Sequence, residues 1–170
     1  MIPLPLETER LRIRPFEPER DAGPLHELWG DAEAMQFIPG GVKTSVDETR
    51  DRLETLRARG REGWGFWAIE ERESGRPVGG VGLFPLNWEG PEIELAYHVV
   101  PSVWNLGYAS EAATAVLAAA WDTGLDHVVA VAMPGNVASR RVMEKLGMSF
   151  EGSTRYRDFD VVRYSIERPT

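Results

Sequence analysis

Residues 92–133 constrain the fold more than any other segment, because two strand patterns flank the strongest helix pattern of the chain. Residues 92–100 have the length and composition of a strand, and residues 107–124 place alanines and larger apolar side chains on one helical face. Residues 127–133 are almost wholly apolar, as is typical of a strand covered on both faces. Two strands joined through a helix predict a parallel β–α–β crossover, which should be right-handed.

The rest of the chain predicts further strands and helices around this crossover. Ser45 with Glu48 has the spacing of a helix capping box, and Gly147 suits the end of a helix. No linker rich in Pro, Gly or Ser divides the chain, so we expect one α/β domain over residues 1–170, a mixed sheet with helices packed on it. The other expected elements are a strand at 11–14, helices at 21–29, 45–59 and 138–146, a hairpin of strands at 65–71 and 76–84, and closing strands at 150–156 and 161–166.

Composition excludes several kinds of chemistry. The 170 residues include no cysteine, which removes disulfides, thiolate metal sites and a cysteine-bound acyl intermediate. The formal net charge of −8 argues against a general nucleic-acid binder, and it either favours encounter with cationic substrates or only maintains solubility. We see no signal-peptide pattern and no apolar run long enough to cross a bilayer, so we expect a cytoplasmic protein without membrane association.

Three glycine-rich stretches are candidates for a phosphate site. Residues 63–68 fit GxGxxA, but a helix pattern precedes them and a strand follows, which is the reverse of the dinucleotide-binding order. Residues 79–82 lie inside a strand and predict a bulge or a close backbone approach. Gly107 follows a strand and opens a helix, so its free amides could hold an anion, or it could be an ordinary helix start.

The segments WNLGYASEA (104–112) and PGNVASRRVMEKLG (134–147) together resemble the GNAT family of acetyl-CoA-dependent N-acetyltransferases. The likeness is strongest to the ribosomal-protein-alanine acetyltransferase-like branch, whose opening resembles ETERLRIRPFEPER and whose closing strand resembles DFDVVRYSI. This resemblance implies a seven-stranded mixed sheet with about four helices. It also implies that the two central strands splay apart and that acetyl-CoA lies between them.

The resemblance also implies where acetyl-CoA is bound. Backbone groups near Val99 would pair with the pantetheine arm, and amides around Gly107 would hold the pyrophosphate. The usual Trp-Gly-basic-Gly turn is absent, so backbone amides must replace the basic side chain. Asn136 would contact the cofactor, although it is equally placed to cap the following helix. The full set of cofactor residues is Val99, Asn105, Leu106, Gly107, Tyr108, Ala109, Ser110, Asn136 and Ser139.

Glu94 is our candidate for the catalytic base. Only a neutral amine can attack a thioester, and an alkyl amine has a pKa of roughly 10, so a base must remove a proton. An acidic residue on a central strand is expected to face a cleft or a partner, and burial there would raise its pKa. In the resembling branch a glutamate at this place activates the amine. The alternative is that Glu94 only pairs with an arginine. His98 shares its predicted strand face, as a second candidate base or as a structural histidine with its hydrogen bonds satisfied.

Ser139 is our candidate for hydrogen-bonding or protonating the leaving sulfur, against the alternative of a first-turn helix serine. The tyrosine that many relatives use as an acid is replaced by Met143. The resemblance places Phe37 and Trp88 at the acceptor, and we assign no metal. We expect direct transfer to a protein N-terminus, a polyamine or an amino sugar, by a protein that could be a homodimer. The alternative function is a non-catalytic module that binds acetyl-CoA as a sensor or partner protein.

Overall fold

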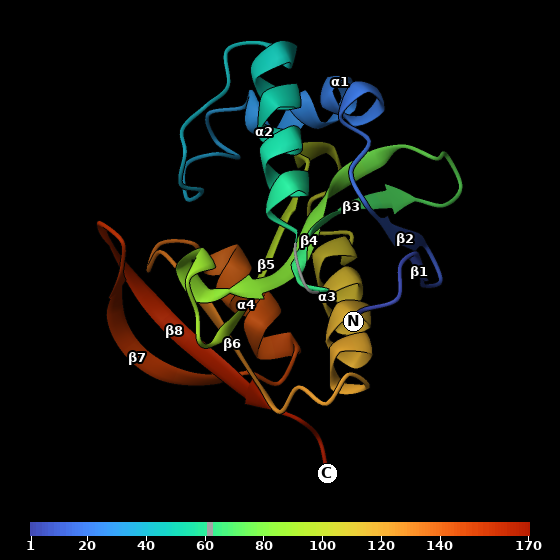
Figure 1. Cartoon of the computed structure of the whole chain (residues 1–170). Coiled ribbons are helices and arrows are strands. Elements are labelled where there is room, and N and C mark those ends of the chain that lie inside the picture. Colours follow the sequence, from blue (N-terminus) through green and yellow to red (C-terminus); the bar gives the residue numbers. More distant parts are fainter. Residues whose placement is uncertain (61–62) are drawn as a thin grey trace.

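The computed structural model describes residues 1–60 and 63–170, and within these it forms one mixed sheet with helices packed against it (Figure 1). The strand order is β1-β2-β3-β4-β5-β6-β8-β7. The strands are β1 (Leu6–Glu7), β2 (Leu11–Arg14), β3 (Gly65–Glu71), β4 (Pro77–Pro85), β5 (Ile93–Val99), β6 (His127–Ala132), β7 (Ser149–Tyr156) and β8 (Phe159–Glu167). The helices are α1 (Pro18–Trp29), α2 (Val46–Arg59), α3 (Tyr108–Trp121) and α4 (Val137–Lys145), with short 3-10 turns at Leu86–Trp88 and Pro101–Val103.

Each element expected from the sequence is present, and the mixed α/β class is confirmed. The described residues contain eight strands rather than seven, because the two-residue β1 adds to the edge of β2 through the pair Leu6–Ile13. Helix α1 begins at Pro18, three residues earlier than predicted, because proline lacks the N–H that a first turn leaves unused. Ser45 caps α2 by accepting the Glu48 N–H at 3.2 Å.

The centre of the sheet divides between β5 and β6. Strand β5 pairs with β4 along its whole length, and β6 pairs in the same way with β8. Between β5 and β6 the parallel ladder contains a single pair, Glu94 with Val129. The predicted parallel crossover and the splay of the two central strands are therefore both confirmed.

Glycines in β4 bring backbones and rings unusually close to the strand. A Cβ at Gly79 would overlap the backbone carbonyl of His98, and one at Gly82 would overlap that of Gly65. A Cβ at Gly80 would overlap the ring of Phe66. The predicted close approach at residues 79–82 is therefore confirmed, and at Gly80 it leaves room for the ring of Phe66.

Helices α1 and α2 pack side by side (Figure 1). A buried ion network anchors α1 to the sheet. Arg14 at the end of β2 is 6 % exposed and donates to both carboxylate oxygens of Asp21 on α1, at 2.8 and 2.9 Å. Its Nε donates to Glu70 of β3 at 2.7 Å. Among the helices described, none is both long enough and apolar enough to traverse a membrane.

Candidate active site

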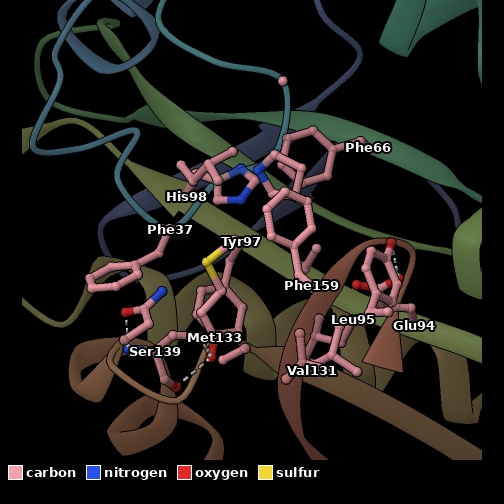
Figure 2. A pocket seen from close by; sticks show the side chains of 18 of the residues that line it. Phe37, Phe66, Glu94, Leu95, Tyr97, His98, Val131, Met133, Ser139 and Phe159 are labelled. Atoms are coloured by element: carbon pink, nitrogen blue, oxygen red, sulfur yellow. Dashed lines mark hydrogen bonds between the residues drawn. The ribbon is translucent and has the colours of Figure 1, made fainter. Parts of the chain in front are cut away.

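A cavity of about 250 Å³ opens where β5 and β6 diverge (Figure 2). Leu95, Tyr97 and His98 of β5 border it, and Val131 of β6 and Met133 just after β6 lie beside Leu95 and Tyr97. Residues 94–98 all border the cavity, although a strand normally sends alternate side chains to opposite faces. This happens because the cavity lies at the free edge of β5, where side chains from both faces reach it.

Glu94 lies in the wall of this cavity with only 5 % of its surface exposed. Burial raises the pKa of its carboxyl to about 7, although the hydrogen bond from Tyr156 and the charge of Arg157 oppose the shift. The Tyr156 hydroxyl donates to Glu94 Oε2 at 3.0 Å. Within residues 1–60 and 63–170, no basic side chain lies within 4 Å of Glu94, so the alternative of an arginine pair does not describe it. It is Glu92 that binds an arginine, Arg163, through two hydrogen bonds of 2.6 and 2.8 Å.

Tyr97 and Ser139 form a second polar group in the cavity, away from Glu94 (Figure 2). The Tyr97 hydroxyl donates to the Ser139 carbonyl at 2.8 Å and lies 3.2 Å from the Ser139 hydroxyl. Burial raises the pKa of Tyr97, so its hydroxyl remains protonated at neutral pH. Asn136 caps α4 by accepting the Ser139 N–H at 3.1 Å, as the capping alternative predicted. Met143, which occupies the position where many relatives have a tyrosine, is buried and lines the cavity. The phenol in this cavity comes instead from Tyr97 of β5.

His98 also borders the cavity, with its ring centroid 5.5 Å from that of Phe66. Its Nδ1 is buried and has no hydrogen-bond partner among the residues described, so the interpretation as a satisfied structural histidine is wrong. Burial, with a smaller effect from the charge of Arg52, lowers the pKa of His98 to about 4. The imidazole is therefore neutral at physiological pH and is a weaker base than Glu94.

The two residues expected at the acceptor, Phe37 and Trp88, both reach the cavity. Phe37 comes from the loop between α1 and α2, and its ring would lie 3.3 Å from a Cβ at Gly135. Trp88 stacks on Phe84 with ring centroids 4.3 Å apart. Trp88 has a left-handed backbone conformation, with a φ of 61°, which side chains larger than glycine rarely adopt. Packing of the cavity wall must therefore hold this turn in place.

The residues expected to hold the pyrophosphate lie outside the cavity lining, at the start of α3. Gly107 has a φ of 83° and precedes the helix without any side-chain cap. In the part of the chain that the structure describes, the N–H groups of Tyr108, Ala109 and Ser110 have no acceptor. The carbonyl of Val99 already accepts the indole N–H of Trp104 at 3.0 Å, so the expected pairing of Val99 with pantetheine would use its backbone N–H.

Arg10 supports the Gly107 turn, a contact that the sequence did not indicate. Its Nη1 donates to the Leu106 carbonyl at 2.8 Å, and its guanidinium lies 4.7 Å from the centroid of the Tyr108 ring. Its Nε donates to Glu111 at 2.7 Å. The turn residues Asn105 and Leu106 carry no charge, and the positive charge that Arg10 brings beside the turn is paired with Glu111, whose carboxylate lies 2.6 Å from its Nη2.

This fold matches that of known proteins. Residues 10–149 match the model of the acetyltransferase (GNAT) domain. The chain belongs to the GNAT family of acetyltransferases. Two relatives from Bacillus subtilis (strain 168) are the uncharacterized N-acetyltransferases YoaA and YnaD. YoaA is 29 % identical, with 99 % of each chain covered, and YnaD is 32 % identical, with 86 % of this chain and 84 % of YnaD covered.

Solved structures of GNAT acetyltransferases superpose on nearly the whole chain. The GNAT-family acetyltransferase from Bacillus anthracis is 29 % identical with a TM-score of 0.82, covering 96 % of this chain and 98 % of its own. An acetyltransferase from Agrobacterium tumefaciens str. C58 is 26 % identical with a TM-score of 0.81, covering 99 % and 96 % respectively. The arrangement of β5, β6 and α3 is therefore that of a GNAT domain.

The GNAT family uses acetyl-CoA, and the residues present fit that molecule. The free amides at the start of α3, with Arg10 beside them, suit a pyrophosphate. The free edge of β5 offers backbone groups to an extended amide-containing arm. Among the described residues, no three His, Asp or Glu side chains gather closely enough to hold a metal ion.

Replacing Tyr156 with phenylalanine in this GNAT domain is expected to raise the pKa of Glu94 above its value of about 7. The Tyr156 hydrogen bond stabilises the carboxylate, so its loss favours the protonated form. The rate kcat/KM should fall severalfold at pH 7 and recover at pH 9, which a pH–rate profile measures. Tyr164→Phe removes a buried hydroxyl outside the cavity and should leave the midpoint of the pH–rate profile unchanged. An unshifted midpoint in Tyr156→Phe would show that the Tyr156 hydroxyl does not control the pKa of Glu94.

Proposed function

We propose that this protein transfers an acetyl group from acetyl-CoA directly to a primary amine, with Glu94 as the base. The observation that supports this most is a buried carboxylate with a pKa of about 7 in the wall of the splayed-strand cavity. A base with a pKa near the working pH combines enough ionised form with enough proton affinity. Polyamines, amino sugars and the N-termini of ribosomal proteins are all acceptors compatible with this chemistry.

The two ends of the cavity would serve different parts of the reaction: Glu94 at one end acts on the amine, and Ser139 at the other acts on the leaving sulfur. Glu94 accepts a proton from the amine, directly or through water, as the new N–C bond forms. The Ser139 hydroxyl, 3.2 Å from that of Tyr97, would hydrogen-bond the sulfur as the C–S bond breaks, and the CoA thiolate that leaves would take its proton from solvent. Aromatic and aliphatic side chains border both ends of the cavity, which lowers the local dielectric constant and strengthens each electrostatic contact.

Two measurements on the purified protein test this proposal. Acetyl-CoA at about 100 times its Kd should stabilise the fold by roughly 2.7 kcal/mol, which raises the Tm by about 5 to 10 °C. With acetyl-CoA present, a panel of amines should contain at least one that releases the CoA thiol.

The possible outcomes separate the alternatives. Stabilisation without thiol release from any amine would indicate a non-catalytic acetyl-CoA-binding module instead. Stabilisation by NADPH but not by acetyl-CoA would overturn both functions.

A further inference from the structure

Three arginines line the cavity near the residues expected to contact the acceptor. Arg52 and Arg59 come from α2, and Arg157 comes from the turn between β7 and β8. Arg59 lies over the ring of Trp88, 5.3 Å from its centroid. Arg157 lies 5.7 Å from the centroid of Tyr156, the residue that donates to Glu94. Of the three, Arg157 is the one whose charge affects the pKa of Glu94, whereas the charge of Arg52 affects that of His98.

None of these three guanidinium groups has a carboxylate within 4 Å among residues 1–60 and 63–170. Arg14, Arg76 and Arg163 each bind carboxylates. Burial lowers the pKa of Arg52, and the charges of Arg59 and Arg157 lower it further. Arg59 and Arg157 are exposed and Arg52 is half-buried, so water screens part of the repulsion among these three like charges. An anion bound between them would relieve the rest, which favours a negatively charged ligand at this place.

The charge of the cavity is opposite to that of the chain. Glu94 is the one acidic residue among the described residues that line it, against three arginines. The whole chain has a net charge of −8. The encounter with cationic substrates that the net charge favours is therefore not supported by the local charge. A polycationic amine would meet repulsion from the wall nearest the base.

The arginines lie on the acceptor side rather than the phosphate side. Arg59 lies over Trp88, a residue expected at the acceptor, whereas Val99 and residues 105–110, expected at the pantetheine and the pyrophosphate, are absent from the described lining of the cavity. The phosphates of acetyl-CoA already have a matching donor set at the start of α3, supported by Arg10. A guanidinium forms two parallel hydrogen bonds with a carboxylate or a phosphate, so the cluster suits either group.

We propose that the acceptor is a small primary amine that carries an anionic group, a carboxylate or a phosphate, bound by Arg52, Arg59 and Arg157. This inference rests on the proposed amine acetyltransfer and narrows its substrate class. The aromatic side chains Phe37, Phe66 and Trp88 give the same cavity an apolar wall that suits the body of the acceptor. An amino acid with an apolar side chain satisfies all three features of the cavity, namely base, cation cluster and aromatic wall.

Matched amines test the inference by thiol release with saturating acetyl-CoA. Phenylalanine is compared with phenylethylamine, which lacks the carboxylate, and with phenylalanine amide, in which the charge is removed. O-Phosphoethanolamine is compared with ethanolamine, and a peptide with an acidic second residue is compared with its amide-bearing counterpart. The anionic member of at least one pair should have a kcat/KM at least tenfold higher. The pair that responds distinguishes carboxylate from phosphate and a free amino acid from a peptide.

Variants assign the effect to the arginines. Arg52→Gln, Arg59→Gln and Arg157→Gln should each raise the KM of the anionic amine at least fivefold, while the KM of acetyl-CoA and the rates with neutral amines change less than twofold. Arg57→Gln is the matched control, because Arg57 is exposed on the same helix and does not line the cavity. Rates are measured at pH 9, well above the pKa of about 7 of Glu94, so that loss of the Arg157 charge does not alter its ionisation.

Each outcome has one meaning. Thiol release that prefers neutral or cationic amines, or that ignores all three substitutions, overturns this inference and leaves the acetyltransfer intact. A rise in the KM of acetyl-CoA instead assigns the arginines to the cofactor and also overturns it. Release with no amine in the panel, despite binding of acetyl-CoA, contradicts the acetyltransfer itself.

Discussion

Replacing Glu94 with glutamine is expected to lower kcat/KM by about 10² to 10⁴-fold, the usual contribution of a general base. Glutamine preserves the shape of the side chain but cannot accept a proton from the amine. In the unaltered protein, kcat/KM should rise with pH through about 7, the pKa of the Glu94 carboxyl, and then level off. This limb of the pH–rate profile should be lost in the variant.

Stability measurements separate this catalytic loss from unfolding. Burial raises the pKa of Glu94 from 4.5 to about 7, so the folded state binds this proton more tightly than the unfolded state. The carboxyl therefore stabilises the fold at low pH, and that stabilisation is lost as the pH rises from about 4.5 through 7. Above pH 7 the variant should be at least as stable as the original protein.

Glu92→Gln is the matched control for this substitution. Glu92 lies just before β5, two residues from Glu94, but binds Arg163 and does not line the cavity. It should retain kcat/KM within about threefold. If Glu94→Gln behaves like Glu92→Gln, Glu94 is not the base.

Replacing Arg14 with methionine is expected to lower the free energy of unfolding by about 3 to 5 kcal/mol. Asp21 is fully buried and Glu70 is 6 % exposed, so removal of the guanidinium leaves Asp21 with an uncompensated buried charge. Glu70 retains Arg20, whose Nη2 lies 2.9 Å from its carboxylate. For a domain of this size, the Tm should fall by roughly 6 to 20 °C.

The neighbouring residue Arg12 provides the comparison. It lies on the same strand, its side chain is 45 % exposed, and its nearest carboxylate, that of Glu7, is 3.8 Å away. Exposed pairs contribute only about 0 to 1 kcal/mol, so Arg12→Met should change the denaturant midpoint little. Equal losses in the two variants would show that burial does not govern the energy of the Arg14 network.

The fold was largely predictable because its elements carry local patterns. The apolar face of residues 107–124 and the Ser45 cap each depend on residues within a few positions of one another. The splay of the central strands was predicted only from the family resemblance. The residue patterns of β5 and β6 do not reveal that these strands are joined by a single ladder pair.

The site was only partly predictable. Glu94, Ser139, Phe37 and Trp88 were named and all reach the cavity. Tyr156, which is 62 positions from Glu94, was missed because no local pattern marks such a contact. Arg52 and Arg59 were not predicted either, because only the tertiary fold brings them into one cavity with Arg157.

The splay also changes how many edges the sheet has. An eight-stranded sheet ordinarily has two, here at β1 and β7, but divergence of β5 from β6 creates two more in its interior. On an outer surface, such open edges promote unwanted pairing between molecules and aggregation. Here they lie inside a cavity of about 250 Å³, so any chain that adds to them must be slender enough to enter. Backbone groups that would promote aggregation at the outside of a sheet can therefore pair here only with a narrow, extended molecule.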